Sequence, residues 1–73
     1  MTVKIDPSLV GKTIKELRLR KNLTQEALAD NMYLSTRNLR RIENQGTTSI
    51  AVVNEFAEYF EVSALDILNG DVL

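Results

Sequence analysis

The sequence predicts an all-α fold, a compact domain of five short helices, and three observations lead to this prediction. Apolar residues recur at helical spacing, first in Val10, Ile14 and Leu17. Residues with the chemistry of helix N-caps stand before the apolar segments, and asparagine or glycine follows several of them. With 73 residues and 44% hydrophobic content, the chain is long enough for one domain with a core and too apolar for a disordered tail.

The composition excludes several classes of protein. There is no cysteine and no histidine, so disulfides, thiol chemistry and a structural zinc site are not expected. The carboxylates are scattered along predicted helix surfaces and there is no glycine-rich phosphate loop, which argues against an enzyme and against a bound cofactor. No apolar run approaches the roughly 18 residues of a membrane span, and the first residues lack a signal-peptide pattern. We therefore expect a cytoplasmic protein that does not enter a membrane.

The first helix is predicted from about Pro7 to Lys21. Asp6 precedes it as an N-cap, and proline is favourable in the first turn because its missing N–H would have no partner there. Asn22 ends the helix, since asparagine tolerates the left-handed conformation of a C-cap. Residues 1–6 form either an arm or a short strand, and residues 7–73 form the domain.

Two further helix starts are predicted at Thr24 and Ser35, whose hydroxyl groups can accept hydrogen bonds from first-turn N–H groups. The helix after the first cap is short and ends near Asn31 or Met32. The helix after the second cap covers about Thr36 to Asn44. The short segment between these two helices indicates a helix-turn-helix pair.

The helix over residues 36–44 has two chemically different sides. Leu39 and Ile42 point to the core, while Asn38 and Glu43 lie on the flanks. The opposite side carries a polar set rich in arginine, namely Thr36, Arg37, Arg40, Arg41 and Asn44. No acid shares that side, although Glu43 can reach Arg40. A purely structural surface more often mixes charges of both signs, so this side indicates a surface for a polyanion.

A fourth helix is predicted over about Ile50 to Glu61, with Ser49 or Thr48 as its cap. Its core-facing side is expected to comprise Ile50, Val53, Ala57 and Phe60, with Phe56 beside them. A second stripe, which either contacts another copy or packs within the domain, consists of Val52, Phe56 and Tyr59.

The last helix is predicted from its capping residues. Ser63 and Asp66 stand three positions apart, as in a capping box. Ile67 and Leu68 then close the core, and Gly70 ends the helix because glycine can adopt a positive φ.

Charged residues are unevenly distributed along the chain. All nine lysines and arginines lie between Lys4 and Arg41, and five acids precede Gln45, so this part has a net charge of +4. The remainder, from Gln45 onward, has no basic residue and five acids, a net charge of −5. A domain with this distribution presents one face to polyanions and keeps the other away from them.

The segments TQEALA at residues 24–29 and LRRIEN at residues 39–44 resemble the lambdoid phage repressor and Cro group of helix-turn-helix regulators, the Xre family. The resemblance extends over almost the whole chain, from Gly11 to Leu68. It implies a compact five-helix, lambda-repressor-like DNA-binding domain whose second and third helices read DNA. The family usually has glycine at the turn position of Tyr33, so either Tyr33 accepts a positive φ or the turn is built differently.

The resemblance also implies roles for individual residues. Positions that face base edges in the major groove match Thr36, Arg37 and Arg41. Positions that contact the DNA backbone match Gln25, Ser35, Arg40, Asn44 and Thr47. A structural ion pair between the first and third helices matches Arg18 and Glu43. Each of the two base-facing arginines can offer a bidentate fork to guanine.

One function is preferred and one alternative stays open. We expect a sequence-specific transcriptional regulator of double-stranded DNA, a repressor, that binds its operator as a homodimer. The dimer contact would come from the stripe of Val52, Phe56 and Tyr59, or from Val72 and Leu73. The alternative is a protein-interaction module of the same fold, such as an antitoxin, whose acidic C-terminal half binds a basic protein partner.

Overall fold

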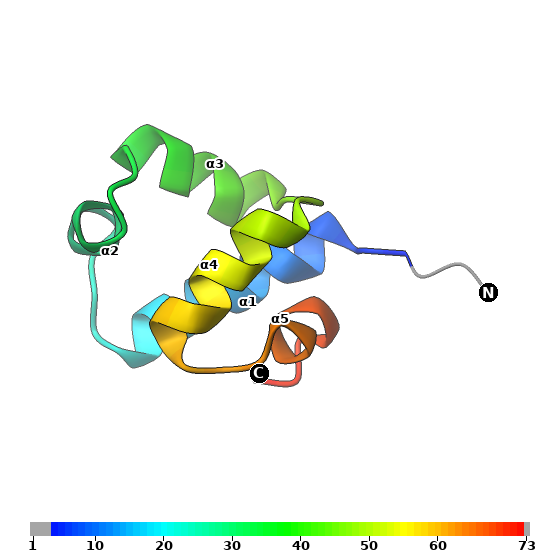
Figure 1. Ribbon diagram of the computed structural model, residues 1–73. Coiled ribbons are helices and arrows are strands. Elements are labelled where there is room, and N and C mark those ends of the chain that lie inside the picture. The colour runs from blue at the N-terminus through cyan, green and yellow to red at the C-terminus, as the bar shows by residue number, and fades with distance from the viewer. Residues whose placement is uncertain (1–3, 73) are drawn as a thin grey trace.

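The computed structural model describes residues 4–72, which fold into five α-helices and contain no β-strand (Figure 1). The helices are α1 (Pro7–Arg20), α2 (Gln25–Asn31), α3 (Thr36–Gln45), α4 (Ile50–Phe60) and α5 (Ala64–Asn69). The all-α class and the five helices are therefore confirmed. The expectations for residues 1–3 and for Leu73 fall outside the described residues, and residues 4–6 adopt no regular structure.

Helix α1 is the element against which most of the others pack. It contacts α3, α5 and α4, while α2 packs on α3 and α4 packs on α5. In Figure 1, α3 lies at the top of the view and α5 at the bottom, with α1 and α4 between them. The pair of α2 and α3 is thus held on one side of the domain. None of the helices in residues 4–72 is long and apolar enough to cross a membrane.

The helix starts follow the predicted capping chemistry. At every N-cap a side-chain oxygen accepts a hydrogen bond from a first-turn N–H group, and these caps are Asp6, Thr24, Ser35, Ser49 and Ser63. Ser63 and Asp66 form the predicted capping box. Each such cap typically contributes about 1 kcal/mol to helix stability. Because these signals are local, the predicted bounds of the first four helices lie within one residue of the observed bounds.

Three helices are followed by a non-glycine residue in the left-handed conformation. These residues, with φ between 56° and 58°, are Asn22, Tyr33 and Glu61. After α2, the Tyr33 N–H donates to the Asp30 carbonyl at 3.2 Å, and the Leu34 N–H donates to the Ala29 carbonyl at 2.8 Å. These are the two bonds of a Schellman motif. Tyr33 therefore accepts the positive φ at the family's glycine position, and its side chain is 97% exposed.

The hydrophobic core lies between α1 and the other helices. Val10, Ile14 and Leu17 of α1 are buried in it, as predicted. The core residues of α4 recur at i, i+3, i+4 and i+7, and they are Val53, Phe56, Ala57 and Phe60. The prediction that Ile50 faces the core is wrong: it is 48% exposed, because it is the first residue of α4 and lies beyond this stripe.

Two glycines allow α1 and the end of α3 to approach closely. A Cβ atom on Gly11 would lie 2.6 Å from the Ile42 carbonyl oxygen, closer than real Cβ contacts. A Cβ atom on Gly46 would lie 1.6 Å from the Pro7 carbonyl oxygen, and Gly46 has a φ of 79°. Both positions therefore require glycine on steric grounds. This contact between backbones fixes α3 relative to α1 and hence the direction in which the outer face of α3 points.

Candidate nucleic-acid interface

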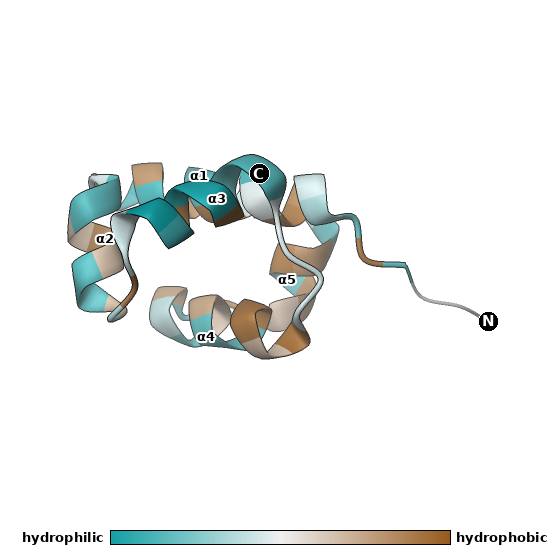
Figure 2. Cartoon of the chain, turned by 90° about the horizontal axis from the view of Figure 1, so that it is seen from above, coloured by the Kyte–Doolittle hydropathy of each residue, from teal (hydrophilic) through white to brown (hydrophobic). Residues whose placement is uncertain are grey.

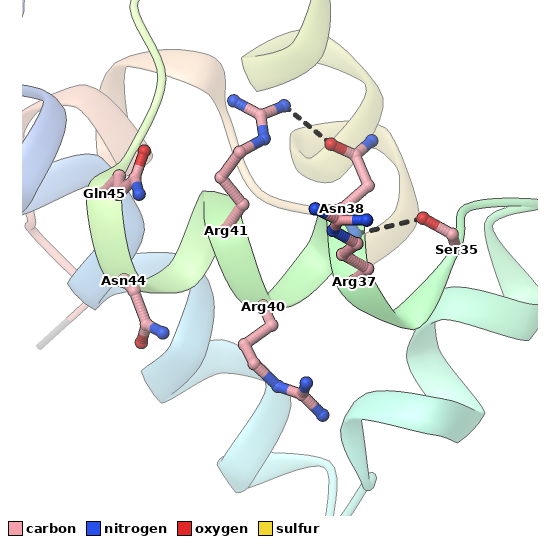
Figure 3. A pocket seen from close by; sticks show the side chains of 7 residues that line it. All are labelled: Ser35, Arg37, Asn38, Arg40, Arg41, Asn44 and Gln45. Carbon is pink, nitrogen blue, oxygen red and sulfur yellow. Dashed lines mark hydrogen bonds between the residues drawn. The ribbon is translucent and has the colours of Figure 1, made fainter.

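The outer face of α3, the side directed away from α1, is hydrophilic and exposed. Figure 2 shows hydrophilic residues along α3, whereas α4 and α5 carry more hydrophobic residues. An open hollow over this face, which we call the α3 hollow, is lined by Ser35, Arg37, Asn38, Arg40, Arg41, Asn44 and Gln45 (Figure 3). Five residues for which the sequence indicates DNA contacts therefore gather around one surface of one helix.

The three remaining candidate contact residues lie outside the lining of the α3 hollow. Thr36 is half-buried at the first position of α3, and Gln25 is the first residue of α2. Thr47 is in the loop after α3, where its hydroxyl accepts a hydrogen bond from the Ser49 N–H at 3.1 Å. Gln25 thus belongs to the neighbouring helix and Thr47 to the following loop, whereas Thr36 lies at the N-terminal end of α3 itself.

Two residues of the α3 hollow are joined by a short hydrogen bond. Arg41 Nη2 donates to Asn38 Oδ1 at 2.6 Å, and Figure 3 shows Arg41 leaning towards Asn38 while Arg40 points in the opposite direction in this view. The Asn38 backbone N–H donates to the Ser35 hydroxyl at 3.0 Å. Helical periodicity alone gives no contact role to Asn38 or Gln45. The i, i+3 spacing of asparagine and arginine is the signal that could have identified the pair.

On the inner side of α3, Glu43 is bound by the guanidinium of Arg18. Arg18 Nε donates to Glu43 Oε2 at 2.7 Å, and Arg18 Nη2 donates to Glu43 Oε1 at 3.1 Å. Arg18 Nη1 also donates to the Leu23 carbonyl at 2.8 Å. Arg18 and Glu43 are only 7% and 6% exposed. The bidentate geometry satisfies both buried charges, and it connects α1 to α3 and to the segment before α2.

Gln25 connects this buried pair to the outer face. Its Nε2 donates to Glu43 Oε1 at 3.1 Å, and Arg40 Nε donates to Gln25 Oε1 over a longer distance of 3.5 Å. The alternative that Arg40 pairs with Glu43 is not realised, because the carboxylate of Glu43 is directed inward and accepts bonds from Arg18 and Gln25. Arg40 instead extends to the start of α2.

The three arginines on the outer face of α3 form no ion pair with an acidic side chain within the described residues. Within residues 4–72 the ion pairs are Arg18–Glu43 and an exposed pair, Arg20–Glu16, so Arg37, Arg40 and Arg41 belong to none. From Gln45 onward the chain has only acidic charges. The outer face of α3 therefore carries a positive potential, while the half formed by α4 and α5 carries a negative one. The described residues contain no cluster of acidic side chains arranged to hold a metal ion.

Comparison with known proteins finds both a family and structural neighbours. The family profile HTH_3, described as Helix-turn-helix, matches residues 14–67. The restriction-modification controller protein C.AhdI from Aeromonas hydrophila is 25% identical, with a TM-score of 0.72 over 85% of this chain and 96% of that chain. The restriction-modification controller protein C.Esp1396I is 31% identical, with a TM-score of 0.69 over 90% of each chain.

A longer protein contains a domain of the same kind. The HTH_3 family transcriptional regulator from Vibrio cholerae is 26% identical, with a TM-score of 0.73 over 89% of this chain but only 37% of that chain. No curated protein matches the chain. The neighbours thus include proteins of nearly the same length and a protein in which the fold is one part.

Proposed function

Because the chain belongs to the HTH_3 family of helix-turn-helix DNA-binding transcriptional regulators, we propose that it is a repressor that binds a specific operator with α3 in the major groove. The observation that carries this proposal is the outer face of α3. Its three arginines are exposed and belong to no ion pair within the described residues. Such side chains are attracted to DNA phosphates, and an α-helix fits the width of the major groove.

Base contacts are proposed for Thr36, Arg37 and Arg41. The two arginines each carry a planar fork of N–H donors, which matches the N7 and O6 acceptors of guanine. Thr36 has a hydroxyl that can donate or accept, and a methyl group that can contact thymine. We therefore expect guanine at two positions of each half-site.

Phosphate contacts are proposed for the polar residues that border the base-contacting set, namely Gln25, Ser35, Arg40, Asn44 and Thr47. The amide of Gln25 has two N–H donors, and only one bonds Glu43, which leaves the other for a phosphate oxygen. Arg40 uses Nε in its contact with Gln25, which leaves its Nη groups free for the same purpose. Phosphate contacts would fix the register of α3 in the groove without reading sequence.

We further propose that the protein binds a palindromic operator as a homodimer, with half-sites roughly 34 Å apart. Phe56 is fully buried, so the expected stripe with Val52 and Tyr59 is not available as a whole for the dimer contact. Leu65 on α5 is 65% exposed and offers apolar surface instead. Analytical ultracentrifugation should give a dimer for the wild type and a monomer for Leu65→Asp, and a dimer in both would exclude this surface.

The DNA-binding proposal is tested by mobility shifts with duplexes selected from a random pool. Arg37→Ala and Arg41→Ala should each weaken binding by roughly tenfold or more, because a bidentate arginine–guanine contact discriminates by about 1–3 kcal/mol. Arg20→Ala is the matched control, since it removes an exposed arginine of α1 that pairs with Glu16 at 3.5 Å. If DNA binding were unchanged in both α3 variants, or weakened equally in both of them and in Arg20→Ala, specific base readout by α3 would be contradicted.

The second candidate, a protein-interaction module, is favoured by a cleft between the end of α2 and α4. Glu55 and Glu58 line this cleft together with the fully exposed Tyr33. A basic partner would be attracted there, and DNA would be repelled. This hypothesis predicts that Glu55→Lys and Glu58→Lys abolish binding of the basic protein partner, whereas Arg37→Ala and Arg41→Ala preserve that binding. The opposite result would support the operator-binding function.

A further inference from the structure

Asn38 has a position and a bonding state that differ from those of the other polar residues on α3. Its backbone N–H is bonded to the N-cap hydroxyl of Ser35, which holds the residue in the first turn of the helix. Its side chain is half-buried, and its Oδ1 accepts the 2.6 Å hydrogen bond from Arg41 Nη2. One of the two lone pairs of this amide oxygen is therefore already used before any DNA is present.

The bond changes what both side chains can offer to a base. A free asparagine reads adenine by donating to N7 and accepting from the N6 amino group. With one lone pair of its carbonyl oxygen bonded to Arg41, Asn38 keeps its two N–H donors and has one acceptor lone pair left for the groove. Arg41 in turn loses part of the rotational freedom of a long, exposed side chain, and keeps donors on its other nitrogens.

We propose that Asn38 is a specificity-determining residue that positions the guanidinium of Arg41, so that the donor fork of Arg41 is held in an orientation that selects guanine. This inference rests on the proposed operator binding by α3. Guanine is the base that presents two acceptors, N7 and O6, side by side in the major groove. The positioned guanidinium disfavours adenine at the same place, because the N6 amino group of adenine would face its N–H donors.

The test measures base preference, which a merely structural role of Asn38 would not change. A duplex is first selected from a random pool with the wild type, and affinities are then measured for every single base-pair replacement in it. Arg41→Ala and Arg37→Ala identify the base pair that each arginine reads. Asn38→Ala should reduce discrimination at the Arg41 base pair roughly tenfold and leave discrimination at the Arg37 base pair unchanged.

Asn38→Asp is the conservative variant that should rescue the preference. Its carboxylate can still accept the hydrogen bond from Arg41, so discrimination for guanine should return. Because it adds a negative charge near phosphates, its affinity should fall by the same factor for all duplexes. Urea unfolding of both variants provides the folding control, and each should unfold at nearly the wild-type midpoint, because the side chain of Asn38 is not part of the core.

Three results would overturn the proposal, and they differ in whether the proposed DNA-binding function of α3 is overturned as well. If Asn38→Ala removes a preference for adenine at a separate base pair, then Asn38 is itself a base reader. If all base preferences survive in Asn38→Ala while Arg41→Ala still loses the preference for guanine, only the positioning role of Asn38 is excluded, and base readout by Arg41 stands. If Arg41→Ala leaves every preference intact, base readout by α3 fails, and the proposed function fails with it.

Discussion

The two faces of α3 differ in how their charged side chains are accommodated. On the inner face, the single charged residue, Glu43, is buried and accepts hydrogen bonds from Arg18 Nε, Arg18 Nη2 and Gln25 Nε2. On the outer face, three arginines are exposed and belong to no ion pair within residues 4–72. A buried charge needs a bonded partner because it has left water, whereas an exposed charge remains solvated.

This difference indicates that stability and recognition are largely separable along one helix of ten residues. Substitutions on the inner face and its contacts with α1 should change the free energy of unfolding. Substitutions on the outer face should change DNA binding and leave the fold intact. Gln25 is the exception, since it contacts Glu43 on one side and Arg40 on the other.

The largest effect is expected from Gly46→Ala, where the inner side of α3 ends against α1. The new Cβ would lie 1.6 Å from the Pro7 carbonyl oxygen, so the backbones of α1 and α3 would have to separate. We expect a loss of about 5 kcal/mol in the free energy of unfolding, comparable to the total stability of a small domain. Chemical denaturation followed by circular dichroism measures it.

Gly70→Ala is the matched control for that variant. Gly70 also has a positive φ, 69°, but its Cβ would meet the Leu9 side chain at 2.9 Å, which can move. The backbone penalty alone is about 1–2 kcal/mol. Equal losses in the two variants would mean that φ, and not the approach of α1 to α3, makes Gly46 necessary.

The second effect in size is expected from Arg18→Met, which keeps the length of the side chain and removes its charge. Glu43 would then stay buried with only the Gln25 amide as a donor. Breaking a buried pair in this way costs about 3 kcal/mol or more in the free energy of unfolding. Urea titration measures the loss.

Arg20→Met tests whether burial is the cause of that loss. Arg20 pairs with Glu16 at 3.5 Å, but these side chains are 50% and 43% exposed, so the change should stay below about 1 kcal/mol. The double variant Arg18→Met/Glu43→Leu should recover part of the stability, since it removes both charges. If it is no more stable than Arg18→Met, packing of the arginine stem and not the unpaired carboxylate is responsible.

A smaller and different effect is expected from Arg40→Ala on the outer face. The free energy of unfolding should change by less than about 0.5 kcal/mol, as for other exposed sites. DNA affinity should fall by a similar factor for all sequences, and the slope of log K against log salt should become shallower by about 0.9 for one lost phosphate contact. Fluorescence anisotropy at several salt concentrations measures both. A change confined to one base pair would instead make Arg40 a base reader.

How much of the fold could be predicted depended on whether the deciding signal was local. Helix starts were predicted well because cap residues such as Ser35 and Ser63 bond N–H groups three positions away. The inward faces of α1 and α3 followed from periodicity. The prediction failed for Ile50, because periodicity does not say where the partner helices end, and Ile50 lies past the buried stripe of α4.

The candidate site was predictable as a face but not as a set of bonds. Periodicity and charge placed three arginines on one side of α3, and the structure gathers them around one hollow. The choice of partners depends on side-chain directions and on the approach of α1, which a helical wheel does not contain. For this reason the bond of Asn38 to Arg41 was missed. The Arg18–Glu43 ion pair, which only the family resemblance implied, is present in the structure and leaves Glu43 unavailable to Arg40.

The smallest effect is expected in the turn that sets the angle between α2 and α3. Tyr33 has a φ of 58°, which costs a non-glycine residue about 1–2 kcal/mol relative to glycine, while glycine gains up to about 1 kcal/mol of chain entropy in the unfolded state. The ring is 97% exposed, so almost no packing is lost on its removal. Tyr33→Gly should therefore raise the free energy of unfolding by roughly 0.5 kcal/mol.

Asn22→Gly is the companion variant, because Asn22 occupies the equivalent left-handed position after α1 with a φ of 56°. Asparagine tolerates that conformation better than tyrosine does, so the gain there should be smaller. Neither residue lines the α3 hollow, and affinity for the selected duplex should stay at the wild-type value in both variants. If Tyr33→Gly destabilised the domain or weakened DNA binding, the tyrosine ring itself, rather than the backbone conformation, would hold α3 at its angle.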